Sequence, residues 1–223
     1  PLTLILRRAP WVPDEVTGGR DTVGIRVPAH PVAQALLAAF GDGIAAPSAN
    51  RFGQVSPTTA AHVRAELGPL VMVLDGGPCQ VGIESTIVDM TGQMPALLRP
   101  GGVPESDIVA LVGELGLSQT AAPGTLAQHY APRTALHLAE DILGAAASFR
   151  AEGLTVETLP AGDPEDHARR LYAELRRLDA LQVDVLVAEP SPHGGLGPAI
   201  NDRLTRAARG SGFPQDHYEG DDG

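Results

Sequence analysis

The sequence predicts an α/β protein of two domains, and three observations support this. After residue 134, short β-branched apolar runs alternate with longer stretches of helical periodicity, as in a small parallel sheet covered by helices. Before residue 118, β-branched runs end at proline and glycine turns. A small, polar, turn-rich stretch separates the two parts. We therefore expect a first domain over residues 1–118, a linker or lid over residues 119–134 and a small second domain over residues 135–223.

The first domain is expected to contain six strands and three helices. The strands are apolar or β-branched runs bounded by turn residues. They cover residues 1–6, 23–27, 44–46, 71–74, 85–90 and 96–99. The helices begin after a proline or a Ser/Thr cap, and the first ends at Gly41. They cover residues 32–40, the stretch from the SPTT run at 56–59 to about residue 67, and residues 105–115.

The second domain is expected to alternate three strands with three helices. The strands cover residues 135–138, 154–159 and 183–189. The helices cover residues 141–152, 167–181 and 200–209. Residues 210–223 are polar and read as a loose tail.

Composition excludes several classes of chemistry. All 16 basic residues are arginine, so the chain holds neither a Walker-type phosphate loop nor a Schiff-base lysine. The net charge of −11 argues against a broad nucleic-acid-binding face. The single cysteine, Cys79, excludes an internal disulfide and a cysteine-built metal site, and the histidines lack metal-ligand spacing. Nothing resembles a signal peptide or a bilayer-spanning run, so we expect a cytoplasmic protein.

The densest group of unusual polar features lies between Arg26 and Arg99. One predicted strand ends beside Arg26 and another ends at Arg99. The PSAN turn at residues 47–50 follows a third predicted strand, and the GIEST run at residues 82–86 leads into a fourth. Polar groups at strand ends are where open α/β sheets bind ligands. Hydroxyls, a side-chain amide and the backbone N–H groups at a helix start can donate hydrogen bonds to phosphate oxygens. Arginines can donate two parallel hydrogen bonds to a carboxylate or a phosphate. The pattern indicates anion-binding donors and not a nucleophile–base pair.

Taken as a set, the motifs resemble the threonylcarbamoyl-adenylate synthase family, the YrdC-type enzymes, in its two-domain form. The matching stretches run in the same order over most of the chain: PLTLIL, GIRVPAHP, AAPSAN, SPTTA, LDGGPCQVGIESTIVD, LLRPGGV, HYAP and GLGPAINDRLTRAA. PSAN, GIEST and HYAP together are the specific part of the match. The resemblance implies a YrdC-like twisted open α/β sheet domain, truncated at its N-terminus, followed by a small Rossmann-like parallel α/β domain.

The family joins L-threonine, bicarbonate and ATP into threonylcarbamoyl-adenylate and pyrophosphate, for a tRNA modification beside the anticodon. The resemblance implies seven residues on the ATP side: Thr22, Ser48, Asn50, Ser56, Arg99, His129 and Tyr130. It implies three at the threonine site: Arg26, Ala46 and Ser85. Arg26 is expected to grip the threonine carboxylate. His129 and Tyr130 are expected to fold over the nucleotide as a lid, and which of the two makes the contact stays open.

The implied reaction needs no protein nucleophile, because N-carboxylated threonine attacks the α-phosphate of ATP with its own carboxylate. Catalysis then comes from alignment and charge stabilisation. Mg²⁺ on the phosphates is the expected cofactor, and it needs few protein ligands because it keeps several waters. The expected partners are ATP, L-threonine, bicarbonate and a downstream tRNA threonylcarbamoyl transferase. Neither membrane binding nor strong direct tRNA binding is expected.

One departure from the family pattern concerns the start of the chain. The family carries an upstream lysine/arginine segment that binds the phosphates and part of threonine, whereas this chain begins at Pro1 inside a predicted strand and has no lysine. We therefore expect a fragment, with little or no synthase activity if the chain is complete in nature. Two alternatives stay open: a YrdC-like carbamoyltransferase module, and a non-catalytic nucleotide- or RNA-binding module.

Overall fold

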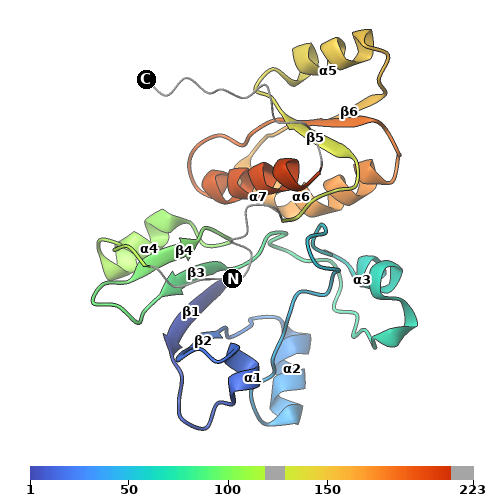
Figure 1. The fold of residues 1–223 in the computed structure, drawn as a ribbon. Coiled ribbons are helices and arrows are strands. Elements are labelled where there is room, and N and C mark those ends of the chain that lie inside the picture. The colour runs from blue at the N-terminus through green and yellow to red at the C-terminus, as the bar shows by residue number, and fades with distance from the viewer. Residues whose placement is uncertain (119–128, 212–223) are drawn as a thin grey trace.

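The computed structural model describes residues 1–118 and 129–211, and it contains two separate sheets (Figure 1). The first sheet has the strand order β2-β1-β3-β4. Its strands are β1 (Leu2–Arg7), β2 (Thr22–Ile25), β3 (Thr86–Asp89) and β4 (Ala96–Arg99). β1 runs parallel to β3, whereas the β1–β2 and β3–β4 pairs are antiparallel. The first domain is therefore an open, mixed α/β sheet.

Local sequence signals explain where the helices of the first domain begin and end. These helices are α1 (Asp14–Thr17), α2 (Pro31–Phe40), α3 (Ala60–Leu67) and α4 (Glu105–Val112), with a short 3₁₀ turn η1 (Gly68–Leu70) after α3. The backbone N–H of Val32 donates to the His30 ring at the start of α2, and that helix ends at Gly41 with φ of 81°. The Thr59 hydroxyl oxygen caps α3 by accepting from the N–H of His62 at 3.2 Å.

Two predicted strands of the first domain are wrong. Residues 44–46 and 71–74 are not strands, and neither stretch joins a ladder within the part of the chain that is described. Their apolar side chains are exposed: Ile44 by 40% and Met72 by 86%. An apolar run predicts a strand only where a neighbouring strand supplies hydrogen bonds, which sequence alone does not reveal. The last helix also ends earlier than predicted, because Gly113 with φ of 80° stops α4 after Val112.

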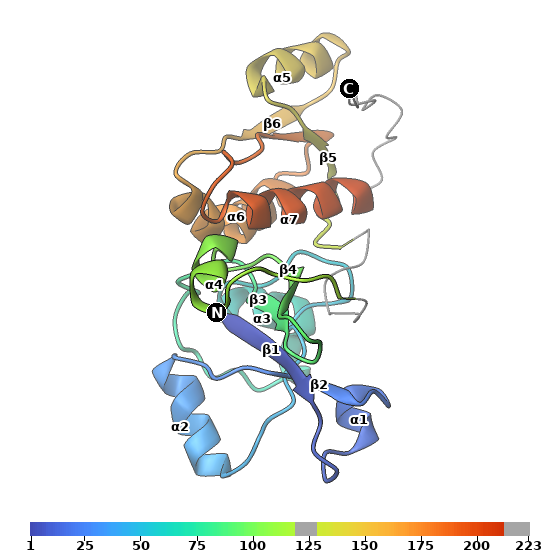
Figure 2. The same ribbon diagram turned by 90° about the vertical axis from the view of Figure 1, so that its left-hand side faces the viewer.

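The second domain has the predicted alternation of strands and helices. Its three parallel strands pair in the order β5-β7-β6. They are β5 (Ala135–Leu138), β6 (Val156–Leu159) and β7 (Val185–Ala188), and the helices are α5 (Ile142–Ala151), α6 (Pro164–Asp179) and α7 (Gly197–Gly210). β7 is central and all four of its residues are buried. α5 covers one face of this sheet, and α6 and α7 cover the face turned toward the first domain (Figures 1 and 2).

The two domains pack directly against each other. Gly82 lies so close to α6 that a Cβ atom there would come within 2.3 Å of the carbonyl oxygen of Ala168. Val55 and Ile83 of the first domain and Tyr130 of the linker belong to the same buried hydrophobic cluster as α6 and α7. The larger of the two hydrophobic clusters therefore contains residues of both domains. The predicted boundaries at residues 118 and 134 stay predictions, and residues 119–128 of the predicted lid and 212–223 of the predicted tail lie outside the described residues.

No helix in the described ranges is both long and apolar enough to cross a membrane.

Candidate functional site

Glu84 lies at the centre of a polar cluster that joins the two domains. The Ser56 hydroxyl donates to its Oε1 at 2.7 Å, and the Tyr172 hydroxyl donates to its Oε2 at 2.8 Å. Arg203 donates from Nε to the same Oε2 at 3.1 Å. Burial opposes the charged carboxylate, but Arg203 and the two hydroxyls outweigh burial, so the pKa of Glu84 lies below its usual value. Glu84 is therefore an anion at neutral pH with three donors from two domains.

Arg99 and Ser85 meet beside this carboxylate. The Nη2 of Arg99 donates to the backbone carbonyl of Ser85 at 2.8 Å and to its hydroxyl oxygen at 3.4 Å. Both side chains are buried, and the Ser85 hydroxyl lies 2.7 Å from that of Thr3. β3 and β4 place them together because Ser85 precedes β3 and Arg99 ends β4. A buried cation thus lies next to a hydroxyl at one edge of the sheet.

A close approach of two loops fixes this edge. The N–H of Gly102 donates to the carbonyl of Glu84 at 2.9 Å. A Cβ on Gly101 would lie 2.4 Å from the carbonyl carbon of Ser85. Only glycine fits at such a separation, which explains why Arg99 is followed by a Pro-Gly-Gly turn. The loop after Arg99 and the loop before Thr86 therefore hold each other in register.

The linker pair His129–Tyr130 packs against the second domain. Tyr130 is 1% exposed and has φ of 62°, a left-handed backbone that is unusual for tyrosine. Its ring stacks on Tyr172 with centroids 5.6 Å apart, and the guanidinium carbon of Arg203 lies 5.7 Å from its centroid. Burial lowers the pKa of His129 and raises the pKa of Tyr130, so both rings are neutral at pH 7. His129 is the more accessible of the two.

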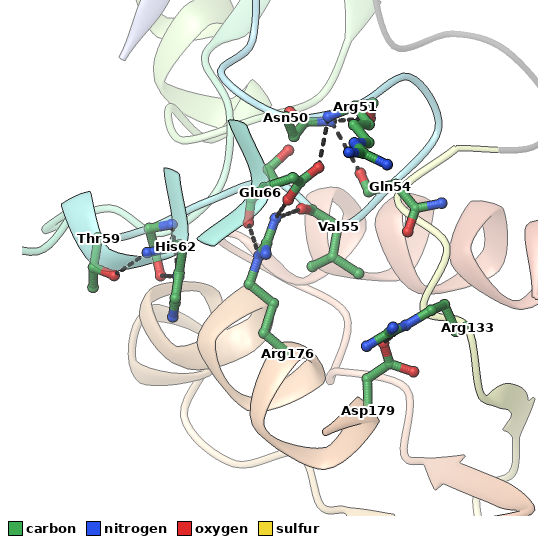
Figure 3. Close-up of polar contacts among 12 residues, drawn as sticks. Asn50, Arg51, Gln54, Val55, Thr59, His62, Glu66, Arg133, Arg176 and Asp179 are labelled. Atoms are coloured by element: carbon green, nitrogen blue, oxygen red, sulfur yellow. Dashed lines mark hydrogen bonds and ion pairs between the residues drawn. The ribbon is translucent and has the colours of Figure 1, made fainter. Parts of the chain in front are cut away.

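Asn50 organises its own loop. Its side-chain amide donates to the carbonyls of Arg51 at 2.8 Å and Gln54 at 3.3 Å (Figure 3). Its Oδ1 is buried and has no hydrogen-bond partner among the described residues. Ser48 and Ala46 lie on the exposed stretch just before it. The PSAN turn therefore presents exposed groups next to an amide that is fixed by its own backbone.

β2 places the last two predicted residues at opposite ends. Thr22 pairs with Arg7 at one end, whereas Arg26 follows Ile25, which pairs with Leu4. At about 3.3 Å per residue, these two residues lie roughly 13 Å apart along the strand. Arg26 is exposed and lies at the end of the strands where Thr3 contacts Ser85. Arg26 thus lies at the same end of the strands as Ser85 and Arg99, with β1 between β2 and β3, and Thr22 lies at the other end of β2.

Arg203 and Tyr172 are site neighbours that sequence reasoning missed. The Arg203 side chain is wholly buried, and its Nη1 donates to the carbonyl of Pro100. Burial opposes its charge, but the neighbouring tyrosines and acidic groups outweigh burial, so the pKa of Arg203 lies above its usual value. One signal was available. Arg203 falls within the apolar stripe of α7, between Ile200 and Leu204, where a charged residue needs a partner.

Similarity to known proteins identifies the family. The family model described as telomere recombination matches residues 1–101, and the model described as the C-terminal domain of threonylcarbamoyl-AMP synthase matches residues 102–209. Threonylcarbamoyl-AMP synthase of Pyrococcus abyssi (strain GE5 / Orsay) is 37% identical over 93% of this chain and 70% of its own length. The corresponding protein of Bacillus subtilis (strain 168) is 38% identical over 94% of this chain and 70% of its own length.

Solved structures agree with this relationship. The crystal structure of P. abyssi Sua5 complexed with L-threonine matches with a TM-score of 0.87 and 37% identity, over 94% of this chain and 71% of that one. A variant of that protein, in which a histidine and the tyrosine after it are alanine, matches with a TM-score of 0.84 and 35% identity, over 94% of this chain and 70% of that one. The mixed first sheet and the parallel second sheet confirm the predicted fold class. The chain belongs to the threonylcarbamoyl-AMP synthase family.

Proposed function

We propose that the protein joins L-threonine, bicarbonate and ATP into threonylcarbamoyl-AMP and pyrophosphate. Relatives named threonylcarbamoyl-AMP synthase cover most of the chain and support the product. The observation that carries the proposal is the continuous set of contacts from Ser56 through Glu84 and Ser85 to Arg99. This set joins residues of the implied ATP side to one of the implied threonine site. Two substrates that react with each other need such adjacent sites.

The threonine side of the proposal rests on Arg26, Ala46 and Ser85. Arg26 and Ser85 lie at the same end of the strands of the first sheet, and Arg26 is exposed there. A guanidinium suits a carboxylate because its planar fork donates two parallel hydrogen bonds. That P. abyssi Sua5 crystallised with L-threonine supports the same amino acid here. We assign Arg26 to the substrate carboxylate.

The ATP side rests on Ser48, Asn50, Ser56, Arg99 and the linker pair His129–Tyr130. Thr22 is kept on this side by the family resemblance alone, since it lies at the far end of β2. Arg99 is a buried cation and suits a phosphate. The Ser56 hydroxyl uses its single proton in the hydrogen bond to Glu84, so only the lone pairs of its oxygen are left for a substrate. Ser56 can donate to a phosphate only after its hydroxyl rotates away from Glu84. Between the two linker residues, the structure favours His129 for the nucleotide contact because Tyr130 is buried against Tyr172.

The chemistry follows from these groups. The threonine amine attacks the carbon of bicarbonate, and the bicarbonate hydroxyl leaves with one amine proton as water, which gives a carbamate. The carboxylate of this carbamate attacks the α-phosphorus of ATP. The bond from the α-phosphorus to the bridging oxygen breaks, and pyrophosphate leaves with that electron pair. The residues named above align the reactants and stabilise charge, and no side chain forms a covalent bond. In well-oriented reactions such alignment can supply up to about 7–11 kcal/mol of the barrier.

We also propose that Mg²⁺ enters with ATP and neutralises phosphate charge when it is bound. In the described ranges, no cluster of three or more His, Cys, Asp or Glu side chains is placed to hold a metal. The carboxylate of Glu84 is already occupied by Arg203, Tyr172 and Ser56. We therefore assign the ion to the phosphates of the nucleotide, where Mg²⁺ keeps several of its waters.

The product class implies the remaining partners. Threonylcarbamoyl-AMP is a mixed anhydride, so a transferase that moves its acyl group to tRNA must consume it. We place that sequence of reactions in the cytoplasm, where the tRNA acceptor is. Because the chain is acidic overall, we expect the adenylate and not the tRNA to pass through this site.

The test is pyrophosphate release from ATP by the protein translated from its complete reading frame. Release that needs both threonine and bicarbonate supports the proposal, and detection of threonylcarbamoyl-AMP by mass spectrometry identifies the product. Parallel reactions replace threonine with serine or with carbamoyl phosphate. Release that follows carbamoyl phosphate and ignores threonine would contradict the proposal in favour of a carbamoyltransferase. Tight, salt-sensitive tRNA binding without any turnover would contradict it in favour of an RNA-binding module.

A further inference from the structure

We propose that Arg203 and Tyr172 of the second domain are positioning residues for the reaction in the first domain, and that they act through Glu84. The inference rests on the proposed function, since it assigns a role in the same site. It means that the second domain forms part of the scaffold that sets the geometry of Ser56, Ser85 and Arg99.

Both oxygens of the Glu84 carboxylate accept hydrogen bonds, and they do so from different domains. One oxygen accepts from Ser56 in the first domain, at 2.7 Å. The other accepts from Tyr172 at 2.8 Å and Arg203 at 3.1 Å, both in the second domain. Ser56 therefore has its hydroxyl direction set by a carboxylate that α6 and α7 hold in place. Glu84 also directly precedes Ser85, so any shift of its backbone moves the implied threonine site.

The guanidinium of Arg203 makes a second contact, with the loop after β4. Its Nη1 donates to the carbonyl of Pro100, the residue directly after Arg99. One side chain thus holds the loop that carries Glu84 and Ser85 and also the loop that carries Arg99. These two loops touch through Gly101, where a Cβ would clash with the backbone of Ser85. A displacement of Arg203 would therefore reach both loops together.

Stability of the fold does not by itself account for a buried arginine at position 203. The Arg203 side chain has no solvent exposure, and its neighbours on the buried side of α7 are apolar. Replacing buried ionic groups by apolar side chains of similar volume is often neutral or stabilising. Burying the Arg203 guanidinium costs desolvation free energy, and its hydrogen bonds to Glu84 and Pro100 end beside implied substrate contacts. Both facts fit a role in positioning those contacts.

The experiment compares the complete protein with its Tyr172→Phe, Arg203→Met and Glu84→Gln variants. Threonine-dependent pyrophosphate release gives kcat and the KM for each substrate, and thermal unfolding gives stability. We expect kcat to fall roughly tenfold for Tyr172→Phe and about a hundredfold for Arg203→Met, as for small misplacements of reacting groups, with each KM changed by less than about threefold. In the Glu84→Gln background, Tyr172→Phe should cost less than about threefold further, because the path through Glu84 is already broken.

Arg150→Met is the matched control. Arg150 also donates from a guanidinium to a backbone carbonyl, that of Val156 at 2.8 Å, but both partners lie within the second domain. The inference is overturned if Arg150→Met loses as much kcat as Arg203→Met at the same melting temperature, or if Tyr172→Phe and Glu84→Gln combine additively. If Arg203→Met fails to fold, Tyr172→Phe decides, since it removes one hydroxyl only. An inactive wild type overturns the proposed function, whereas an active wild type with unimpaired variants overturns this inference alone.

Discussion

Arg176 of α6 and Glu66 of α3 form an ion pair that joins the two domains (Figure 3). The side chains are 19% and 11% exposed, and Arg176 also donates to the carbonyls of Val55 and Ser56. The other oxygen of Glu66 accepts from the N–H of Arg51 at 2.6 Å. One pair therefore fixes α6, α3 and the loop that leads to Ser56.

Glu66→Gln should lower the free energy of unfolding by about 1–3 kcal/mol, because it weakens hydrogen bonds to a mostly buried cation. Urea unfolding followed by circular dichroism measures the change. Glu174→Gln is the control, since its partner Arg177 is 58% exposed and such surface pairs are worth about 0–1 kcal/mol. Equal losses in the two variants would contradict the assignment of this pair to the domain interface.

Arg99→Ala should weaken ATP binding by about 1.5–3 kcal/mol, the range for hydrogen bonds to a charged group. The physical reason is loss of a buried cation next to Ser85. Calorimetry with a non-hydrolysable ATP analogue measures the change. Arg64→Ala is the control, because Arg64 forms an exposed ion pair with Asp75, away from Ser85. Unchanged ATP affinity in the Arg99 variant would show that the phosphate assignment is wrong.

Arg26→Ala should raise the KM for threonine by roughly tenfold or more, while ATP affinity changes little. Arg26 is exposed at the sheet edge and its backbone continues β2, so the fold should tolerate the change. Steady-state kinetics with each substrate varied in turn separates the two effects. A variant that loses ATP affinity and keeps its threonine KM would place Arg26 on the nucleotide side.

The two lid residues should behave differently. His129→Ala should lower ATP affinity by roughly tenfold, the loss of about one hydrogen bond to a charged group. Tyr130→Phe should leave ATP affinity unchanged, because the Tyr130 ring stays packed between Tyr172 and Arg203. ATP titration of both variants checks the assignment. The reverse result would make the Tyr130 hydroxyl the nucleotide contact.

His167 should make stability depend on pH. Its imidazole is wholly buried on α6, and burial, aided by Arg170, lowers its pKa to about 4. The unfolded chain binds the proton more tightly, so this contribution is complete above pH of about 6.5 and is lost as pH falls toward 4. The loss reaches about 3 kcal/mol, at about 1.4 kcal/mol per unit of pKa difference.

Thermal unfolding from pH 4 to pH 7 tests this dependence. His167→Leu should flatten the curve between pH 4 and pH 6.5. His193→Leu, at an exposed loop position, should leave the slope as it is in the wild type. A His167→Leu protein with an unchanged slope would contradict the prediction.

Much of the fold was predictable because local signals decided it. β4 and β5 match their predicted residues, and α2 ends at the predicted glycine. The failures at residues 44–46 and 71–74 have a common cause: each has strand-like composition, but no described strand pairs with it. The short helix α1 was missed because four residues give no periodicity to detect.

The site was predictable in part. The GIEST and LLRPGGV motifs place Ser85 and Arg99 beside each other, as expected of residues that form one site. Arg203 was not found because its partner Glu84 lies 119 residues away in the sequence. The place of Arg203 in the apolar stripe of α7 indicates burial, but only tertiary packing shows which acceptors its guanidinium reaches. Long-range polar partners are the part that periodicity and capping rules do not reach.

The hydrophobic cluster shared by both domains limits how the protein can be divided. Val55 and Ile83 fill space under α6 and α7, so a second domain expressed without its neighbour would present that apolar face to water. From their sequence, α6 and α7 look like the outer layer of an independent domain, but both lie between the second sheet and the first domain. Cutting the chain between the two domains would therefore leave apolar surface of both parts uncovered.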